Sequence, residues 1–81
     1  MEFSFKPRGV CSREIKIEVV EDTVKKVEFV GGCKGNTQGV ARLCVDRKVD
    51  DLITLLDGIQ CRSGTSCPDQ LAKALKAYKQ N

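Results

Sequence analysis

Residues 13–30 read REIKIEVVEDTVKKVEFV, and more of the architecture follows from this segment than from any other. Over residues 13–20, isoleucine and valine alternate with charged side chains, which is the period-two pattern of a strand with one buried face. Residues 24–30 repeat the pattern, and the connection between them, residues 21–23, is short and polar. The segment therefore predicts two antiparallel strands joined as a hairpin.

Residues on either side of the hairpin complete the predicted fold. Upstream, residues 3–6 are expected to form a short edge strand that ends at Pro7 and Gly9. Downstream, residues 31–36 are rich in glycine and predict a loop. Apolar residues then recur at helical spacing in three segments, residues 37–46, 49–59 and 67–78. Strands followed by helices predict one α+β domain over residues 1–81, with a small antiparallel sheet of two or three strands and three helices packed on one face.

The third helical segment has the clearest start. Ser66 followed by Asp69 fits a capping box, and Pro68 is favoured in a first turn. The apolar stripe of this segment comprises Leu71, Ala74, Leu75 and Tyr78. The stripe of the first helical segment comprises Val40, Leu43 and Cys44. We expect both stripes to face the sheet.

Composition excludes several kinds of function. The chain has no histidine, so it cannot contain a Ser–His or Cys–His nucleophile pair, and no catalytic residue is predicted. Few aromatic residues and a net charge of only +3 do not favour nucleic-acid binding. Lys73, Lys76 and Lys79 fit a solvated helix end better than a phosphate site.

Neither a signal peptide nor a membrane span is evident, so we expect a cytoplasmic protein.

Five cysteines are the most informative residues in the chain. Cys44 lies one turn after Val40 on an apolar stripe, where a free cysteine acts as a small apolar side chain of the core. The other four lie in loops or at the ends of elements: Cys11, Cys33, Cys61 and Cys67. Thiols stay reduced in the cytoplasm, and four thiolates are a common zinc-binding set. Because a chain this short has a small core, a zinc site formed by these four cysteines would add stability that the fold needs.

Two other interpretations of these cysteines stay open. Cys61 and Cys67 could form a redox pair, because the positive end of a helix dipole stabilises a thiolate at Cys67. The cysteines could instead be structural thiols of a protein-interaction module. Their spacing is irregular and contains no Cys-x-x-Cys pair, so it does not choose between these interpretations. A tight turn that presents Cys33, and not a phosphate-binding loop, is the expected role of three glycines: Gly31, Gly32 and Gly35.

The string Thr65-Ser66-Cys67-Pro68-Asp69 resembles the signature that gives the TSCPD domain family its name. Four further segments are similar to parts of this family: residues 9–12, 31–36, 58–61 and 70–75. The resemblance extends over nearly the whole chain. It implies that the cysteine segments of the family correspond to Cys11, Cys33, Cys61 and Cys67, with Cys44 outside them.

Members of this family occur as short proteins and as a segment near the C-terminus of ribonucleotide reductases. The resemblance therefore implies an accessory domain related to that segment of ribonucleoside-diphosphate reductase, with a role in DNA synthesis. A reductase needs a large barrel, a radical-generating site and nucleotide pockets, and 81 residues cannot hold them. The chain is thus not expected to be a complete enzyme, and any part in ribonucleotide reduction would be exercised in trans on a reductase subunit.

Overall fold

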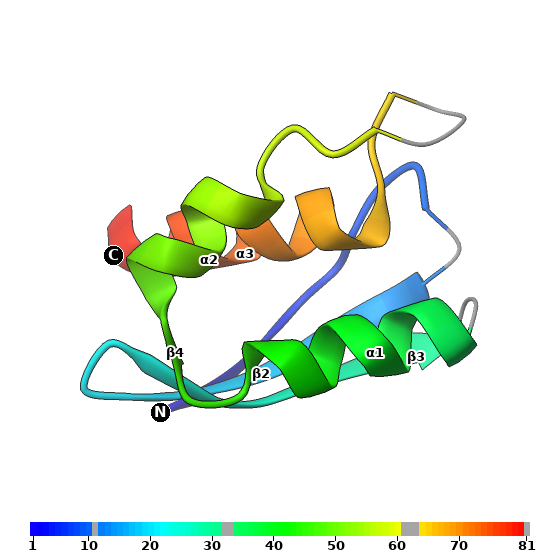
Figure 1. Ribbon diagram of the computed structural model, residues 1–81. Coiled ribbons are helices and arrows are strands. Elements are labelled where there is room, and N and C mark those ends of the chain that lie inside the picture. Colours follow the sequence, from blue (N-terminus) through cyan, green and yellow to red (C-terminus); the bar gives the residue numbers. More distant parts are fainter. Residues whose placement is uncertain (11, 32–33, 61–63, 81) are drawn as a thin grey trace.

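The predicted hairpin is present at the centre of the sheet. The computed structural model describes residues 1–10, 12–31, 34–60 and 64–80 (Figure 1). Strands β2 (Ser12–Val20) and β3 (Thr23–Gly31) pair antiparallel. The two residues between them, Glu21 and Asp22, have positive φ angles of 51° and 61°. Such angles at both central residues make a tight hairpin turn whose twist matches that of the strands.

Two short strands extend the hairpin to a four-stranded sheet of order β1-β2-β3-β4. Strand β1 (Glu2–Phe5) pairs antiparallel with β2, as expected. Strand β4 (Arg47–Lys48) pairs antiparallel with the first two residues of β3. The prediction of two or three strands was therefore one strand too low. Both residues of β4 are exposed, so no alternation of apolar and polar residues marked this strand in the sequence.

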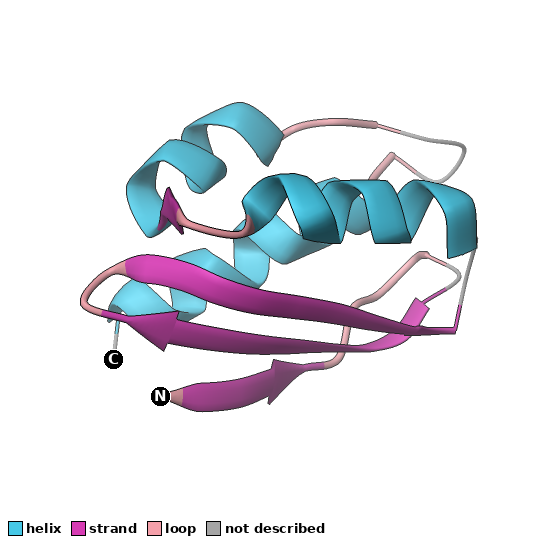
Figure 2. Cartoon of the chain, turned by 60° about the horizontal axis from the view of Figure 1, so that its bottom comes forward, coloured by secondary structure: helices cyan, strands magenta, loops and turns pink. Residues whose placement is uncertain are grey.

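Three helices cover one face of this sheet, which Figure 2 shows from a second direction. They are α1 (Lys34–Cys44), α2 (Val49–Leu56) and α3 (Cys67–Gln80). Helix α1 packs over β3, and α2 packs against α3. None of the described helices combines the length and the apolar character that a membrane crossing requires.

The helix ends differ from the predicted ones. Helix α1 begins at Lys34, so the second half of the predicted glycine loop belongs to the helix. It ends before Asp46, whose φ of 66° is incompatible with a right-handed helix. Helix α2 ends at Leu56, because Asp57 is extended and Gly58 has a φ of 85°. Glycine after the last turn was the one local signal for that end.

The core lies between the inner face of the sheet and the helices. The inner face of the hairpin supplies Ile15, Ile17, Val19, Val24 and Val27, and the helices supply Cys44, Val49, Leu52, Leu71, Ala74 and Leu75. Leu43 was expected on the inner stripe of α1 and is 71% exposed, so this expectation was wrong. Successive side chains of an α-helix lie about 100° apart around the helix axis. Leu43 therefore points well away from the buried side chain of Cys44 and away from the sheet. The opposite face of the sheet carries mostly charged side chains: Glu2, Glu14, Lys16, Glu18, Lys26 and Glu28.

Candidate functional site

The start of α3 and the start of β2 meet at one end of the molecule. Cys67 is the first residue of α3, and its Sγ lies 3.1 Å from the Oγ of Ser12, the first residue of β2. Ser12 is buried, whereas Cys67 is partly exposed and not in a disulfide. A serine hydroxyl at this distance is able to donate to a thiolate or to accept from a thiol. Cys67 therefore combines access to solvent with a polar neighbour from a distant part of the chain.

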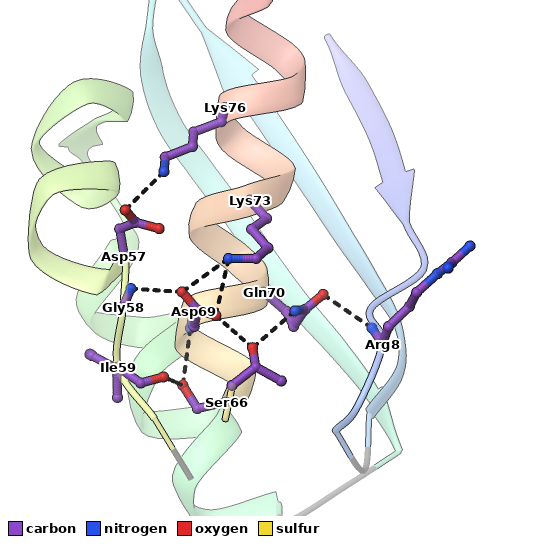
Figure 3. Close-up of polar contacts among 10 residues, drawn as sticks. Arg8, Asp57, Gly58, Ile59, Ser66, Asp69, Gln70, Lys73 and Lys76 are labelled. Carbon is purple, nitrogen blue, oxygen red and sulfur yellow. Dashed lines mark hydrogen bonds and ion pairs between the residues drawn. The ribbon is translucent and has the colours of Figure 1, made fainter. Parts of the chain in front are cut away.

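Ser66 and Asp69 form half of the expected capping box. The backbone N–H of Asp69 donates to Ser66 Oγ at 3.1 Å, which satisfies one of the free N–H groups of the first turn. The Ser66 hydroxyl in turn donates to the carbonyl of Ile59 at 2.7 Å. That second bond ties the chain before α3 to the helix start (Figure 3). The predicted capping role of Ser66 is confirmed, whereas the carboxylate of Asp69 accepts its hydrogen bonds from Thr65 and Gly58.

The Asp69 carboxylate is the centre of this polar cluster, although the residue is only 3% exposed. It accepts hydrogen bonds from the Thr65 hydroxyl at 2.5 Å and from the Gly58 N–H at 2.7 Å. Lys73, one turn along α3, adds an ion pair at 3.2 Å. These contacts, that of Thr65 first, lower the pKa of Asp69 below its ordinary value of 3.8, against the opposing effect of burial. The charged carboxylate thus holds the α2–α3 connection onto α3.

Gln70 links the same cluster to the segment that follows β1. Its side-chain amide donates to Thr65 Oγ1 at 2.9 Å, and its carbonyl oxygen accepts from the Arg8 N–H at 3.1 Å. No pattern in the sequence indicated the roles of Gln70 and Gly58. Lys73 could have been anticipated, because it follows Asp69 by four residues on a helix. Every buried side-chain nitrogen and oxygen in the described ranges has a hydrogen-bond partner.

Of the four predicted metal ligands, only Cys67 falls in the part of the chain that the structure describes. Cys11, Cys33 and Cys61 lie outside the described residues, as does Gly32. The described residues contain no group of three or more side chains suited to hold a metal ion, and three of the four proposed thiolates are not among them. The prediction of a four-cysteine site therefore stays a prediction.

Residues close in sequence to two of these cysteines nevertheless lie at the same end of the sheet as Cys67. Ser12, which follows Cys11 in the sequence, pairs across the hairpin with Gly31. Gly31 has a φ of 81°, a conformation that residues with a side chain rarely adopt, so glycine is favoured at the end of β3. The predicted tight turn that presents Cys33 lies outside the described residues beyond Gly31 and stays a prediction. Gly35 lies in α1 rather than in a loop.

Cys44 is apart from this cluster and belongs to the core. It is 2% exposed on the inner side of α1, as its position one turn after Val40 predicted. Burial raises the pKa of the Cys44 thiol to about 11, with only partial compensation from Arg47. Such a thiol stays protonated at neutral pH and is chemically inert.

Each of the three lysines of α3 forms an ion pair with an aspartate carboxylate. Lys73 pairs with Asp69, Lys76 with Asp57 at 2.8 Å, and Lys79 with Asp50 at 3.1 Å. The Asp50 carboxylate raises the pKa of Lys79. Two of these pairs connect α3 to the two ends of α2 (for Lys76, see Figure 3). This arrangement fits the expected solvated helix end and leaves no row of unpaired lysines for a phosphate.

Comparison with known proteins gives one match. The model of the TSCPD domain family matches residues 3–79, which is almost the whole chain. No curated protein and no solved structure matches the chain.

Proposed function

Since this chain belongs to the TSCPD domain family, we propose that it is an accessory domain that binds zinc through Cys11, Cys33, Cys61 and Cys67. The zinc would be structural, because four thiolates complete its tetrahedral shell and leave no position for substrate. Its binding free energy would add to the folding free energy of a small core.

The contact between Cys67 and Ser12 is the main observation that supports this proposal. It brings a partly exposed thiol from α3 against the start of β2, across 55 positions of sequence. Consecutive Cα atoms are about 3.8 Å apart, so Cys11 is one such step from Ser12 and Cys33 is two steps from Gly31. Cys67 itself fits a zinc ligand, since it is free, accessible and beside a hydroxyl that can donate to its thiolate.

The resemblance suggests where such a domain acts. The family also occurs as a C-terminal segment of ribonucleotide reductases, so the domain would act in trans on a reductase subunit and support DNA synthesis. The protein would be cytoplasmic, where thiols stay reduced and therefore remain able to bind the metal.

Metal and thiol content of the full chain, purified without added metal, tests the zinc site. We expect about one equivalent of zinc per chain and protection of four thiols from alkylation until a chelator is added. Cys67→Ser should lower the zinc content, while its hydroxyl keeps a partner for Ser12. Cys44→Ala is the matched control and should leave the zinc content unchanged. Less than a tenth of an equivalent of zinc or iron in the unaltered chain would contradict the proposal.

A second candidate is thiol–disulfide exchange by Cys61 and Cys67. Cys67 is not in a disulfide and is partly exposed at the start of a helix, which favours this function because an exchanging thiol has to be accessible. This candidate predicts a reversible intramolecular disulfide between the two cysteines in metal-free protein, detected by mass spectrometry after mild oxidation. If both thiols of the metal-free chain alkylate at the rate of an ordinary cysteine, the redox function is excluded.

A further inference from the structure

Strand β3 has an edge that is mostly without a partner strand. Its register with β4 covers only Thr23 and Val24. From Lys26 to Gly31 no strand in the described ranges pairs with this edge. Backbone N–H and C=O groups on a free edge are a template for another strand. The structure thus offers a docking edge of about six residues.

A hollow of about 330 Å³ runs beside this free edge, under α1. It is lined by Val27, Glu28 and Phe29 of β3 and by Thr37, Gln38 and Ala41 of α1. An added strand would place alternate side chains in this hollow, against Val27 and Phe29, and the remaining ones on the charged outer face. Edge pairing next to a side-chain pocket is a common way to recognise an extended peptide.

Charge determines which strand fits. Lys26 and Glu28 are exposed on the outer face, on either side of Val27. On the other edge of β3, the strand β2 already matches them, with Lys16 opposite Glu28 and Glu18 opposite Lys26. Opposite charges across a strand pair stabilise the pairing and like charges weaken it. A strand on the free edge would need the same complementary pattern.

We propose that the free edge of β3 binds an extended segment of a partner protein as an added antiparallel strand. The segment carries a basic residue opposite Glu28, an apolar residue opposite Val27 and an acidic residue opposite Lys26. A further apolar residue lies opposite Phe29, beneath α1. The proposal rests on described residues of β3 and α1, and it does not require that zinc binds.

A second copy of this chain does not fit the same edge. Antiparallel self-pairing matches the charges only when Val27 of one copy faces Val27 of the other. That register places Val30 and Gly31 of the second copy opposite Val24 and Thr23, where β4 already pairs. The occupant is therefore a segment of another protein.

A capped peptide with the sequence of residues 13–18, Arg-Glu-Ile-Lys-Ile-Glu, has the required pattern and is the probe. We expect saturable binding of the fluorescein-labelled peptide to the full chain, measured by fluorescence anisotropy. A control peptide in which only the last Glu and the Lys change places, Arg-Glu-Ile-Glu-Ile-Lys, keeps the composition and puts like charges opposite both Lys26 and Glu28 in the antiparallel register. It should bind about tenfold more weakly. Equal binding of the two peptides, or no saturable binding, would overturn the proposal.

Amide shifts of the unaltered ¹⁵N-labelled chain locate the peptide without any substitution. Shifts that centre on Lys26–Val30 and on Thr37–Ala41 would support the proposal. Shifts that centre on β1, which forms the other free edge of the sheet, would overturn it. A chain carrying Lys26→Glu and Glu28→Lys, with Lys16→Glu and Glu18→Lys to keep opposite charges across β2 and β3, should reverse the preference between the two peptides.

Discussion

Asp69 occupies the last position of a capping-box pattern, but its carboxylate makes different hydrogen bonds from those that the pattern predicts. The capping box predicts that the residue at this position returns a hydrogen bond to the first residue of the box. Aspartate is one methylene shorter than the glutamate that usually fills the position. Its carboxylate bonds instead to Gly58 and Thr65, which lie before the helix. The sequence predicted that the Asp69 side chain caps α3, but it could not predict that this carboxylate would bind the preceding connection instead.

The substitution Asp69→Asn tests this role through the pH dependence of stability. An amide offers one acceptor oxygen where the carboxylate offers two, so we expect a loss of about 2 kcal/mol in the free energy of unfolding near neutral pH. Because the folded pKa lies below 3.8, the contribution is complete above that value and disappears as the pH falls through the folded pKa. The difference between the two proteins, from urea unfolding, should therefore shrink between about pH 5 and about pH 2.

Asp51→Asn is the matched control for that experiment. Asp51 is exposed in the first turn of α2 and should change stability by about 0.5 kcal/mol or less. A difference between Asp69→Asn and the unaltered chain that stays constant down to about pH 2 would show that the Asp69 charge is not what stabilises the cap.

Among the helices and strands, the sequence predicted those in which apolar residues recur at a regular spacing and missed the strand that has no such spacing. Regular spacing of apolar residues predicted both strands of the hairpin and helix α3. Strand β4 has two residues, too few for any period, and exists because Asp46 turns the chain back toward β3. Helix α1 begins earlier than predicted because glycine weakens a helix without forbidding it, and tertiary packing on β3 outweighs that cost.

Leu75 and Leu43 offer a matched test of which helix faces hold the domain together. Leu75 is fully buried on α3, whereas Leu43 is 71% exposed on α1. Leu75→Ala should lower the free energy of unfolding by about 3 kcal/mol, from lost burial and the cavity left behind. Leu43→Ala should change it by about 0.5 kcal/mol or less. Comparable losses in chemical denaturation would mean that α1 packs through Leu43, as the sequence alone suggested.

For the whole molecule, the fold class was predictable and the convergence of distant segments was not. Strands before helices were enough to give an α+β arrangement with helices on one face. The meeting of Ser12 with Cys67 and of Arg8 with Gln70 spans more than half of the chain. Such contacts follow from how the layers pack, and no local pattern encodes them. The positions of four cysteines in the sequence suggested a shared site. Of these four, only Cys67 belongs to the described residues.

Chelation tests the contribution of metal to the whole domain. If zinc joins the sheet to the helices, its removal should lower the thermal midpoint by about 10 °C, which for a domain of this size corresponds to about 2 kcal/mol. The Cys67→Ser chain should show a low midpoint that the chelator does not lower further. An unchanged midpoint in the metal-loaded, unaltered chain would indicate that the hydrophobic core alone sustains the fold.

The hydrogen bonds at the start of α3 also affect how distant relatives should be interpreted. Thr65, Ser66 and Asp69 are engaged in fastening one helix to the connection before it, and Pro68 suits the same first turn. An uncharacterised protein that keeps these residues but has lost the thiol would therefore still be expected to fold in this way. Recognition of the signature in a genome then reports a shared architecture, and the cysteines have to be inspected separately before any chemistry is assigned.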